Sequence, residues 1–190
     1  MVSDVIRNHR RSLRLKGYDY SQAGGYFVTI CAYRKQCLFG EIIDAKMQLN
    51  EFGEVVQEEW LRTEKVRDRV ELDVSMIMPN HLHGIIILKN DINEVGATRR
   101  VAHSRPCGLK AGSLAAMIGQ FKSLVTKRIN QMRNMRGSHV WQRNYYEHVI
   151  RNDRELNDIR EYIINNPMAW DLDRENPFAL SVGKRALWDF

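Results

Sequence analysis

The sequence contains few cysteines, and they form no recognised pattern. Cys31, Cys37 and Cys107 are odd in number, and none belongs to a C-x-x-C pair. Disulfide frameworks use even numbers of cysteines, and structural zinc sites use closely spaced pairs. The sequence therefore indicates neither a disulfide-stapled domain nor a zinc knuckle, and we expect reduced thiols.

Long apolar runs are also missing. A membrane-spanning helix needs roughly 18 or more consecutive apolar residues, and no segment approaches that length. The first twenty residues are polar and basic, without the apolar core of a secretory signal. We therefore expect a protein that does not enter the membrane and resides in the cytoplasm.

Positive charge exceeds negative charge. The 190 residues include 29 Lys and Arg against 23 Asp and Glu, which gives a net charge of +6. Such a balance favours a polyanionic partner. No basic amphipathic helix with an aromatic face stands out, so nucleic acid is preferred over an anionic membrane.

The length predicts a single domain over 1–190 that contains three irregular segments. Residues 1–24 form a basic N-terminal arm, and residues 171–190 form a tail expected to dock through Phe178, Leu187 and Trp188. Residues 89–112 lack periodicity and contain Gly, Pro and basic residues, which predicts a flexible surface loop. The core lies within 25–170.

Strand and helix patterns alternate along this core. Strand patterns occur at 26–34, 72–78, 81–88 and 139–150, and a short extra hairpin is expected at 38–50. Helical patterns occur at about 50–66, from Ser113 onwards, and from Asn152 or Asp153 to before Pro167. This order predicts an α+β fold with the ferredoxin-like split βαβ topology. We expect an antiparallel sheet with helices on one face, plus an extra C-terminal helix.

Two histidines follow the turn signal Pro79-Asn80 at the start of an apolar run. Because side chains alternate along a strand, His81 and His83 point to one face and Leu82 to the other. Imidazole nitrogens bind divalent metals well, but two ligands alone rarely hold an ion. The pair by itself is equally compatible with a metal site and with polar residues at a strand end.

The last helix adds a phenol and an amide. Tyr162 and Asn166 are four residues apart, so they lie one helical turn apart at the edge of the apolar stripe. Each alone has an ordinary explanation, a half-buried aromatic and a cap before Pro167. Together with the histidines they form a coherent site, with the amide oxygen as third metal ligand and the phenol as nucleophile toward a phosphodiester.

The ordered set of motifs resembles a known family. The chain is similar to the single-tyrosine HUH transposases of bacterial insertion sequences, and more closely to the REP-associated tyrosine transposases. The resemblance covers most of the chain and rests on five segments: RLKGYDYSQAGGYFVTICAYRKQCLFGEI, MPNHLHGIIIL, GQFKSLVTKRIN, VWQRNYYEHVIRNDREL and YIINNP.

The resemblance implies a function and roles for particular residues. It implies Tyr162 as nucleophile, and His81, His83 and Asn166 as ligands of Mg²⁺ or Mn²⁺. Its reaction cuts single-stranded DNA beside a folded hairpin, leaving a 5′-phosphotyrosyl link and a free 3′-hydroxyl, and the same site can rejoin strands. Two assemblies stay open, a complete site in one chain and a homodimer that exchanges the tyrosine helix.

Two imidazole ligands suit Mn²⁺ better than Mg²⁺, which prefers oxygen. Tyr145 and Tyr146 are rival nucleophiles, but neither has an amide partner one helical turn away. We expect them to pack or to stack on bases. Basic residues of the arm, the loop and the second long helix are candidates for neutralising phosphates, although solvated faces explain such charges equally well. These are Arg11, Arg14, Lys16, Arg99, Arg100, Arg105, Lys122, Lys127 and Arg128.

Two rival functions use other chemistry. A noncatalytic nucleic-acid-binding protein with the ferredoxin-like fold would read bases through sheet aromatics, but the expected aromatic RNP pattern is absent and the histidines would be idle. A phosphodiesterase with two histidine motifs would need a second H-x-[ST] motif, which the sequence lacks. The metal-dependent transposase is therefore the preferred hypothesis.

Overall fold

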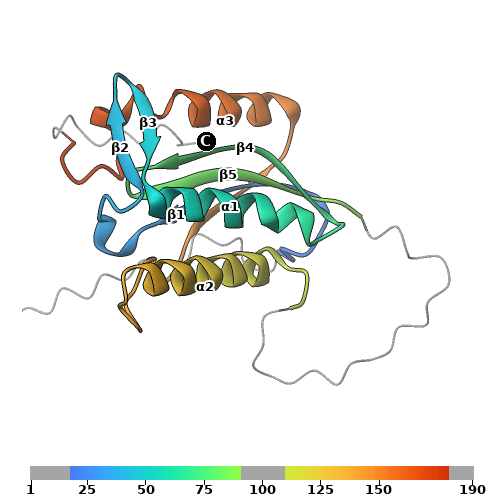
Figure 1. Ribbon diagram of the computed structural model, residues 1–190. Helices are drawn as coiled ribbons and strands as arrows, with labels where there is room; N and C mark the ends of the chain where they lie inside the picture. The colour runs from blue at the N-terminus through green and yellow to red at the C-terminus, as the bar shows by residue number, and fades with distance from the viewer. Residues whose placement is uncertain (1–17, 91–109, 180–190) are drawn as a thin grey trace, which may run out of the picture.

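The computed structural model describes residues 18–90 and 110–179. Its centre is a four-stranded sheet, which lies between helices (Figure 1). The strands are β1 (Gly24–Cys31), β4 (Val70–Met78), β5 (His81–Leu88) and β6 (Tyr146–Ile150). Their spatial order is β4-β5-β1-β6, and every neighbouring pair is antiparallel. With α1 (Glu51–Lys65) and α2 (Leu114–Met132) in the two crossovers, this is the expected α+β, ferredoxin-like split βαβ fold.

Helices α1 and α2 cover one face of the sheet (Figure 1). Their N-termini are capped as the sequence predicts, by the side chains of Asn50 and Ser113. Alternate residues of β1 and β5 bury their side chains against these helices: Tyr26, Val28, Ile30, Leu82, Ile86 and Leu88. The main hydrophobic core therefore lies between the sheet and these two helices.

Helix α3 (Asp153–Asn165) lies on the opposite face of the sheet (Figure 1). Its N-cap is Asn152, whose side chain accepts a hydrogen bond from the backbone N–H of Glu155. Ile159 and Ile163 pack there against Phe27 of β1 and Ile85 of β5 in a second, smaller core. The extra helix thus faces the residues of β1 and β5 that point away from α1 and α2.

A small hairpin precedes α1, as the sequence predicts. It consists of β2 (Gly40–Ile43) and β3 (Lys46–Leu49), paired antiparallel. Its turn residues Asp44 and Ala45 have φ values of 50° and 58°. This pair of left-handed residues matches the backbone twist that a two-residue hairpin requires.

Two expected strand boundaries are wrong. β1 stops at Cys31 instead of continuing to residue 34, because the chain turns into a short 3-10 helix at Tyr33–Lys35. The last strand begins at Tyr146 rather than near residue 139, and Trp141 contributes only an isolated bridge to Ala32. Local residue preferences therefore predicted both strands to be longer than they are.

The segment after α3 returns to the sheet. It contains a 3-10 helix at Trp170–Leu172, and the following residues lie beside the start of β5. The expected docking of Phe178 is wrong, because its side chain is 81% exposed. Leu187 and Trp188 lie outside the described residues, as do residues 1–17 and 91–109. Within the described ranges, no helix has the length and apolarity needed to cross a membrane.

Candidate metal and tyrosine site

His81 and His83 lie at the start of β5, on the face that α3 covers. Their neighbours across the sheet are Cys31 and Thr29 of β1. Both imidazoles are buried, and their Nε2 atoms are 2.9 Å apart. The alternation expected from the H-x-H spacing is confirmed, since Leu82 points into the opposite core.

Asp173 completes a buried cluster with the two histidines. Its Oδ2 lies 3.8 Å from Nε2 of His81, and the ligand atoms of the three residues lie within 4.8 Å of one another. Oδ2 of Asp173 has no hydrogen-bond partner among the described residues. Sequence reasoning missed this residue, because it lies in an irregular segment 90 residues after His83 and belongs to no motif.

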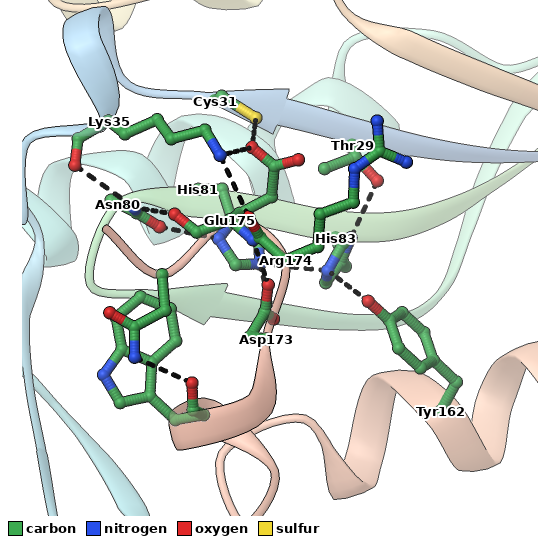
Figure 2. A network of polar contacts seen from close by, with 12 residues as sticks. Thr29, Cys31, Lys35, Asn80, His81, His83, Tyr162, Asp173, Arg174 and Glu175 are labelled. Carbon is green, nitrogen blue, oxygen red and sulfur yellow. Dashed lines mark hydrogen bonds and ion pairs between the residues drawn. The ribbon is translucent and has the colours of Figure 1, made fainter. Parts of the chain in front are cut away.

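Tyr162 of α3 reaches this cluster. Its hydroxyl lies 3.1 Å from Nε2 of His83 (Figure 2). Its ring packs edge-on against Phe27. Burial raises the pKa of the Tyr162 phenol well above its ordinary value, and the nearby Asp173 carboxylate raises it further. A hydrogen bond with the side chain of Asn166 lowers this pKa in part.

Asn166 is the C-cap of α3 and is buried. Its Oδ1 has no hydrogen-bond partner among the residues the structure describes. A buried amide oxygen without a partner has lost its hydrogen bonds to water and has gained none from the protein, which is energetically unfavourable. Such an atom is expected where a ligand normally completes the site, so the observation is compatible with the predicted role of Asn166.

Burial also controls the charge of the two histidines. It lowers the pKa of His81 to about 3, and the positive charge of Lys35 contributes to this shift. Burial likewise lowers the pKa of His83 well below its usual value, and neighbouring His81 adds to the effect. Neutral imidazole is the form that offers a lone pair to a metal. The environment therefore favours the ligating form of both side chains.

Residues after α3 hold the edge of the site. Oε2 of Glu175 lies 3.3 Å from the Lys35 ammonium and accepts a hydrogen bond from the Cys31 thiol (Figure 2). The Lys35 ammonium also donates to the backbone carbonyl of Arg174, at 3.0 Å. These contacts hold the segment that contains Asp173 beside the histidines. Residues 173–175, which the sequence placed in an irregular tail, therefore contribute to the candidate site.

The donor set fits a divalent cation. It offers two imidazole nitrogens and one carboxylate oxygen within a buried cluster, and the orphaned amide oxygen of Asn166 lies at the end of the same helix as Tyr162. Mixed nitrogen and oxygen donors of this kind bind Mn²⁺, Zn²⁺ and related ions. The expected metal site is therefore chemically reasonable, with Asp173 as an additional candidate ligand.

The predicted phosphate contacts fall in different environments. The Lys122 ammonium donates to the backbone carbonyls of Gln142, Arg143 and Asn144, and burial lowers its pKa to about 8. Arg128 is paired with Glu58 and Glu59. Lys127 is exposed and lines a hollow of about 500 Å³ between α2 and residues 137–143. The other six predicted contacts lie outside the described residues: Arg11, Arg14, Lys16, Arg99, Arg100 and Arg105.

Tyr145 and Tyr146 make packing contacts. Tyr145 packs against the main core, while Tyr146 packs against the smaller core, with its ring centroid 6.1 Å from that of Phe27. Burial raises the pKa of Tyr146. The tyrosine hydroxyl that lies beside His83 is that of Tyr162, at 3.1 Å from Nε2.

No family model matches the chain, but one protein is similar to it in sequence and one solved structure is similar to it in fold. The sequence is 42% identical over 171 residues to an uncharacterized protein of Haemophilus influenzae (strain ATCC 51907 / DSM 11121 / KW20 / Rd), covering 88% of this chain and 93% of that protein. The structure is similar to that of a REP-associated tyrosine transposase bound to a REP hairpin. The TM-score is 0.55 at 16% identity, and the match covers 92% of this chain and 99% of that chain. The chain therefore belongs to the family of the Haemophilus influenzae protein and has the fold of the REP-associated tyrosine transposases.

Proposed function

We propose that the protein is a metal-dependent transposase and endonuclease that cleaves single-stranded DNA beside REP-like hairpins and rejoins it. One observation carries the proposal: the hydroxyl of Tyr162 lies 3.1 Å from Nε2 of His83, within a buried cluster of metal-ligating side chains. The solved protein that shares this fold is bound to a REP hairpin, which supports the same class of partner.

In the proposed reaction, the Tyr162 oxygen attacks phosphorus of the scissile phosphodiester. A 5′-phosphotyrosyl bond forms as the bond to the 3′-oxygen breaks. The Tyr162 phenol gives up its proton and the leaving 3′-oxygen takes up one, so no net proton is released. Because one phosphodiester replaces another, attack by a 3′-hydroxyl on the phosphotyrosine reverses the step and joins strands.

His81, His83 and Asn166 are the proposed ligands of Mg²⁺ or Mn²⁺, with Asp173 as a further ligand. When bound, the cation would polarise the phosphodiester and offset the negative charge that Asp173 places beside Tyr162. The imidazoles favour Mn²⁺ over Mg²⁺. Phe27 restricts the Tyr162 ring from one side, which keeps its hydroxyl at the cluster.

A hollow on the α2 side of the sheet, opposite the face that α3 covers, is a further candidate for contact with DNA. The hollow beside α2 is lined by Lys127, His139 and Arg143, and its lining contains no carboxylate side chain. Phosphate contacts by such residues carry no sequence information but contribute strongly to affinity. The predicted contacts of the N-terminal arm and of loop 89–112 belong to the same proposal.

The test uses a labelled single-stranded oligonucleotide that contains a hairpin, incubated with the protein and either Mn²⁺ or Mg²⁺. We expect a covalent protein–DNA adduct on a denaturing gel for the wild type and for the matched control Tyr146→Phe. We expect none for Tyr162→Phe. An adduct that persists in Tyr162→Phe, or an unchanged rate in His81→Ala and His83→Ala, would show that the assignment is wrong.

A different outcome would favour the rival function. If the wild type binds the hairpin oligonucleotide but forms no adduct with either metal, the noncatalytic nucleic-acid-binding hypothesis is preferred. The same gel and a binding titration, run on one preparation, therefore separate the two.

A further inference from the structure

Asn80 does more than form the turn between β4 and β5. Its Nδ2 donates to the backbone carbonyls of Lys35, at 3.2 Å, and Glu175, at 2.6 Å. Because carbonyl oxygens only accept hydrogen bonds, the amide nitrogen must face them. The amide oxygen is thereby directed to Nδ1 of His81, 2.8 Å away (Figure 2).

This acceptor determines the protonation pattern of His81. An amide oxygen can satisfy Nδ1 only if Nδ1 carries a hydrogen. In the neutral ring, the lone pair is then on Nε2. Nε2 is the atom that faces His83 and Asp173. Asn80 thus directs the metal-binding lone pair of His81 into the cluster.

His83 has a different kind of partner. Its Nδ1 lies 2.8 Å from the hydroxyl of Thr29, which can donate or accept by rotating. Two lone pairs 2.9 Å apart would repel, so the observed contact between the Nε2 atoms requires a hydrogen on one of them. Since His81 offers a lone pair, the hydrogen lies on Nε2 of His83, and the Thr29 hydroxyl donates to Nδ1.

We propose that Asn80 presets His81 in the Nδ1–H tautomer, and that His83 exchanges its ring hydrogen from Nε2 to Nδ1 when a divalent cation binds. Thr29 changes from donor to acceptor in the same step. Each ring keeps one hydrogen, so no net proton is gained or lost. The inference rests on the proposed cation site, and it makes Asn80 and Thr29 positioning residues for that site.

The test is ¹⁵N NMR of the histidine ring nitrogens, which distinguishes protonated from lone-pair nitrogen. In EDTA-treated protein we expect His81 protonated at Nδ1 and His83 at Nε2. With Zn²⁺, a diamagnetic probe, we expect both rings protonated at Nδ1. A hydrogen on Nε2 of His81 in the EDTA-treated protein would overturn the role of Asn80, and this result requires no variant.

Variants of Asn80 test whether its amide oxygen, rather than its amide nitrogen, sets the tautomer of His81. Asn80→Asp retains an acceptor, so His81 should stay in the Nδ1–H form. Asn80→Ala removes it, and we expect mixed tautomers at His81 and about tenfold or greater weakening of Zn²⁺ binding by calorimetry. Asn157→Ala, which removes an exposed amide of α3, is the matched control and should change neither. An unchanged His81 spectrum in folded Asn80→Ala would contradict the inference.

The same spectra separate this inference from the proposed function. If His81 has the Nδ1–H form but Zn²⁺ shifts neither ring, the cation site and the exchange at His83 are wrong, while the role of Asn80 is supported. If both tautomers behave as expected but no DNA adduct forms, the proposed reaction fails and the inference holds.

Discussion

At the scale of single residues, the buried histidines dominate the behaviour of the site. His81 and His83 are 0% and 3% exposed, and their ring nitrogens contact each other and the side chains of Asn80, Thr29 and Tyr162. Two imidazoles in such an environment are costly to protonate. Their environment therefore affects stability as well as chemistry.

The metal-free protein should lose stability in mild acid. In the unfolded chain a histidine binds a proton near pH 6.5, whereas the folded-state pKa of His81 is about 3. Between these values the unfolded chain binds more protons, so the free energy of unfolding falls as pH falls. The limit is about 1.4 kcal/mol per pH unit for each histidine.

Urea unfolding in EDTA at pH 7 and pH 5 measures this effect. His81→Asn should lose less stability than the wild type between the two pH values, whereas the variant of an exposed histidine, His139→Asn, should match the wild type. Equal losses in all three proteins would contradict the explanation.

Asp173 should contribute to metal affinity. Asp173→Asn removes a charged ligand atom close to both histidines, and we expect Mn²⁺ binding to weaken about tenfold or more. Asp171→Asn makes the same charge change at an exposed position of the same segment and should have little effect. Calorimetric titration measures both. If Asp173→Asn binds normally while Asn166→Ala does not, Asn166 is the third ligand and Asp173 is not.

At the scale of elements, the position of Tyr162 depends on the small apolar contact between α3 and the sheet. Ile159 and Ile163 face the sheet, while Asp73 of β4 pairs with Arg160. The pairing lowers the pKa of the Asp73 carboxyl, mainly through the hydrogen bonds from Arg160. The position of the Tyr162 hydroxyl therefore depends on how α3 packs against β4, β5 and β1.

Adjacent isoleucines of α3 provide a matched test of this seating. Ile163 is fully buried and Ile164 is 55% exposed. Ile163→Ala should lower the free energy of unfolding by about 2–5 kcal/mol, whereas Ile164→Ala should change it by less than about 0.5 kcal/mol. Denaturant unfolding measures the difference. Equal effects would show that α3 does not pack as described.

At the scale of the whole molecule, one chain contains the complete candidate site. Tyr162 contacts His83 of its own chain, and Asp173 follows from the same chain. The sequence left open a homodimer that exchanges the tyrosine helix. Because the residues of the candidate site come together within one chain, each chain could act with its own tyrosine, and an experiment distinguishes this from exchange.

Mixing two inactive variants checks this arrangement. We expect that His81→Ala and Tyr162→Phe, combined in equal amounts, form no DNA adduct, because neither chain contains both groups. A mixture of wild type and Tyr162→Phe is the control for inhibition by the inactive partner. Restored adduct formation in the first mixture would demonstrate that tyrosine helices are exchanged between chains.

Much of the fold could be predicted because the patterns that specify it are local. Helix caps Asn50 and Ser113, the strand alternation around His81 and the Pro79-Asn80 turn all depend on neighbouring residues. The sequence did not predict the early end of β1. Arg34 and Lys35 adopt left-handed φ values of 55° and 56°, which are uncommon for arginine and lysine. The shortened last strand was missed because Lys122, distant in sequence, binds the carbonyls of 142–144.

Like the fold, the candidate site has features that the sequence predicts and features that depend on tertiary packing. The sequence by itself determined the shared direction of His81 and His83 and the one-turn spacing of Tyr162 and Asn166, since both follow from strand and helix periodicity. Only the tertiary structure decided that α3 lies over the histidines, that Asp173 joins them, and that Asn80 orients one of them. Tyr162 is 79 residues from His83, and Asp173 is equally remote in sequence from His81. Asn80 is adjacent to His81, but carbonyls of the distant residues Lys35 and Glu175 orient its amide, so packing of the whole chain rather than local preference decides all three.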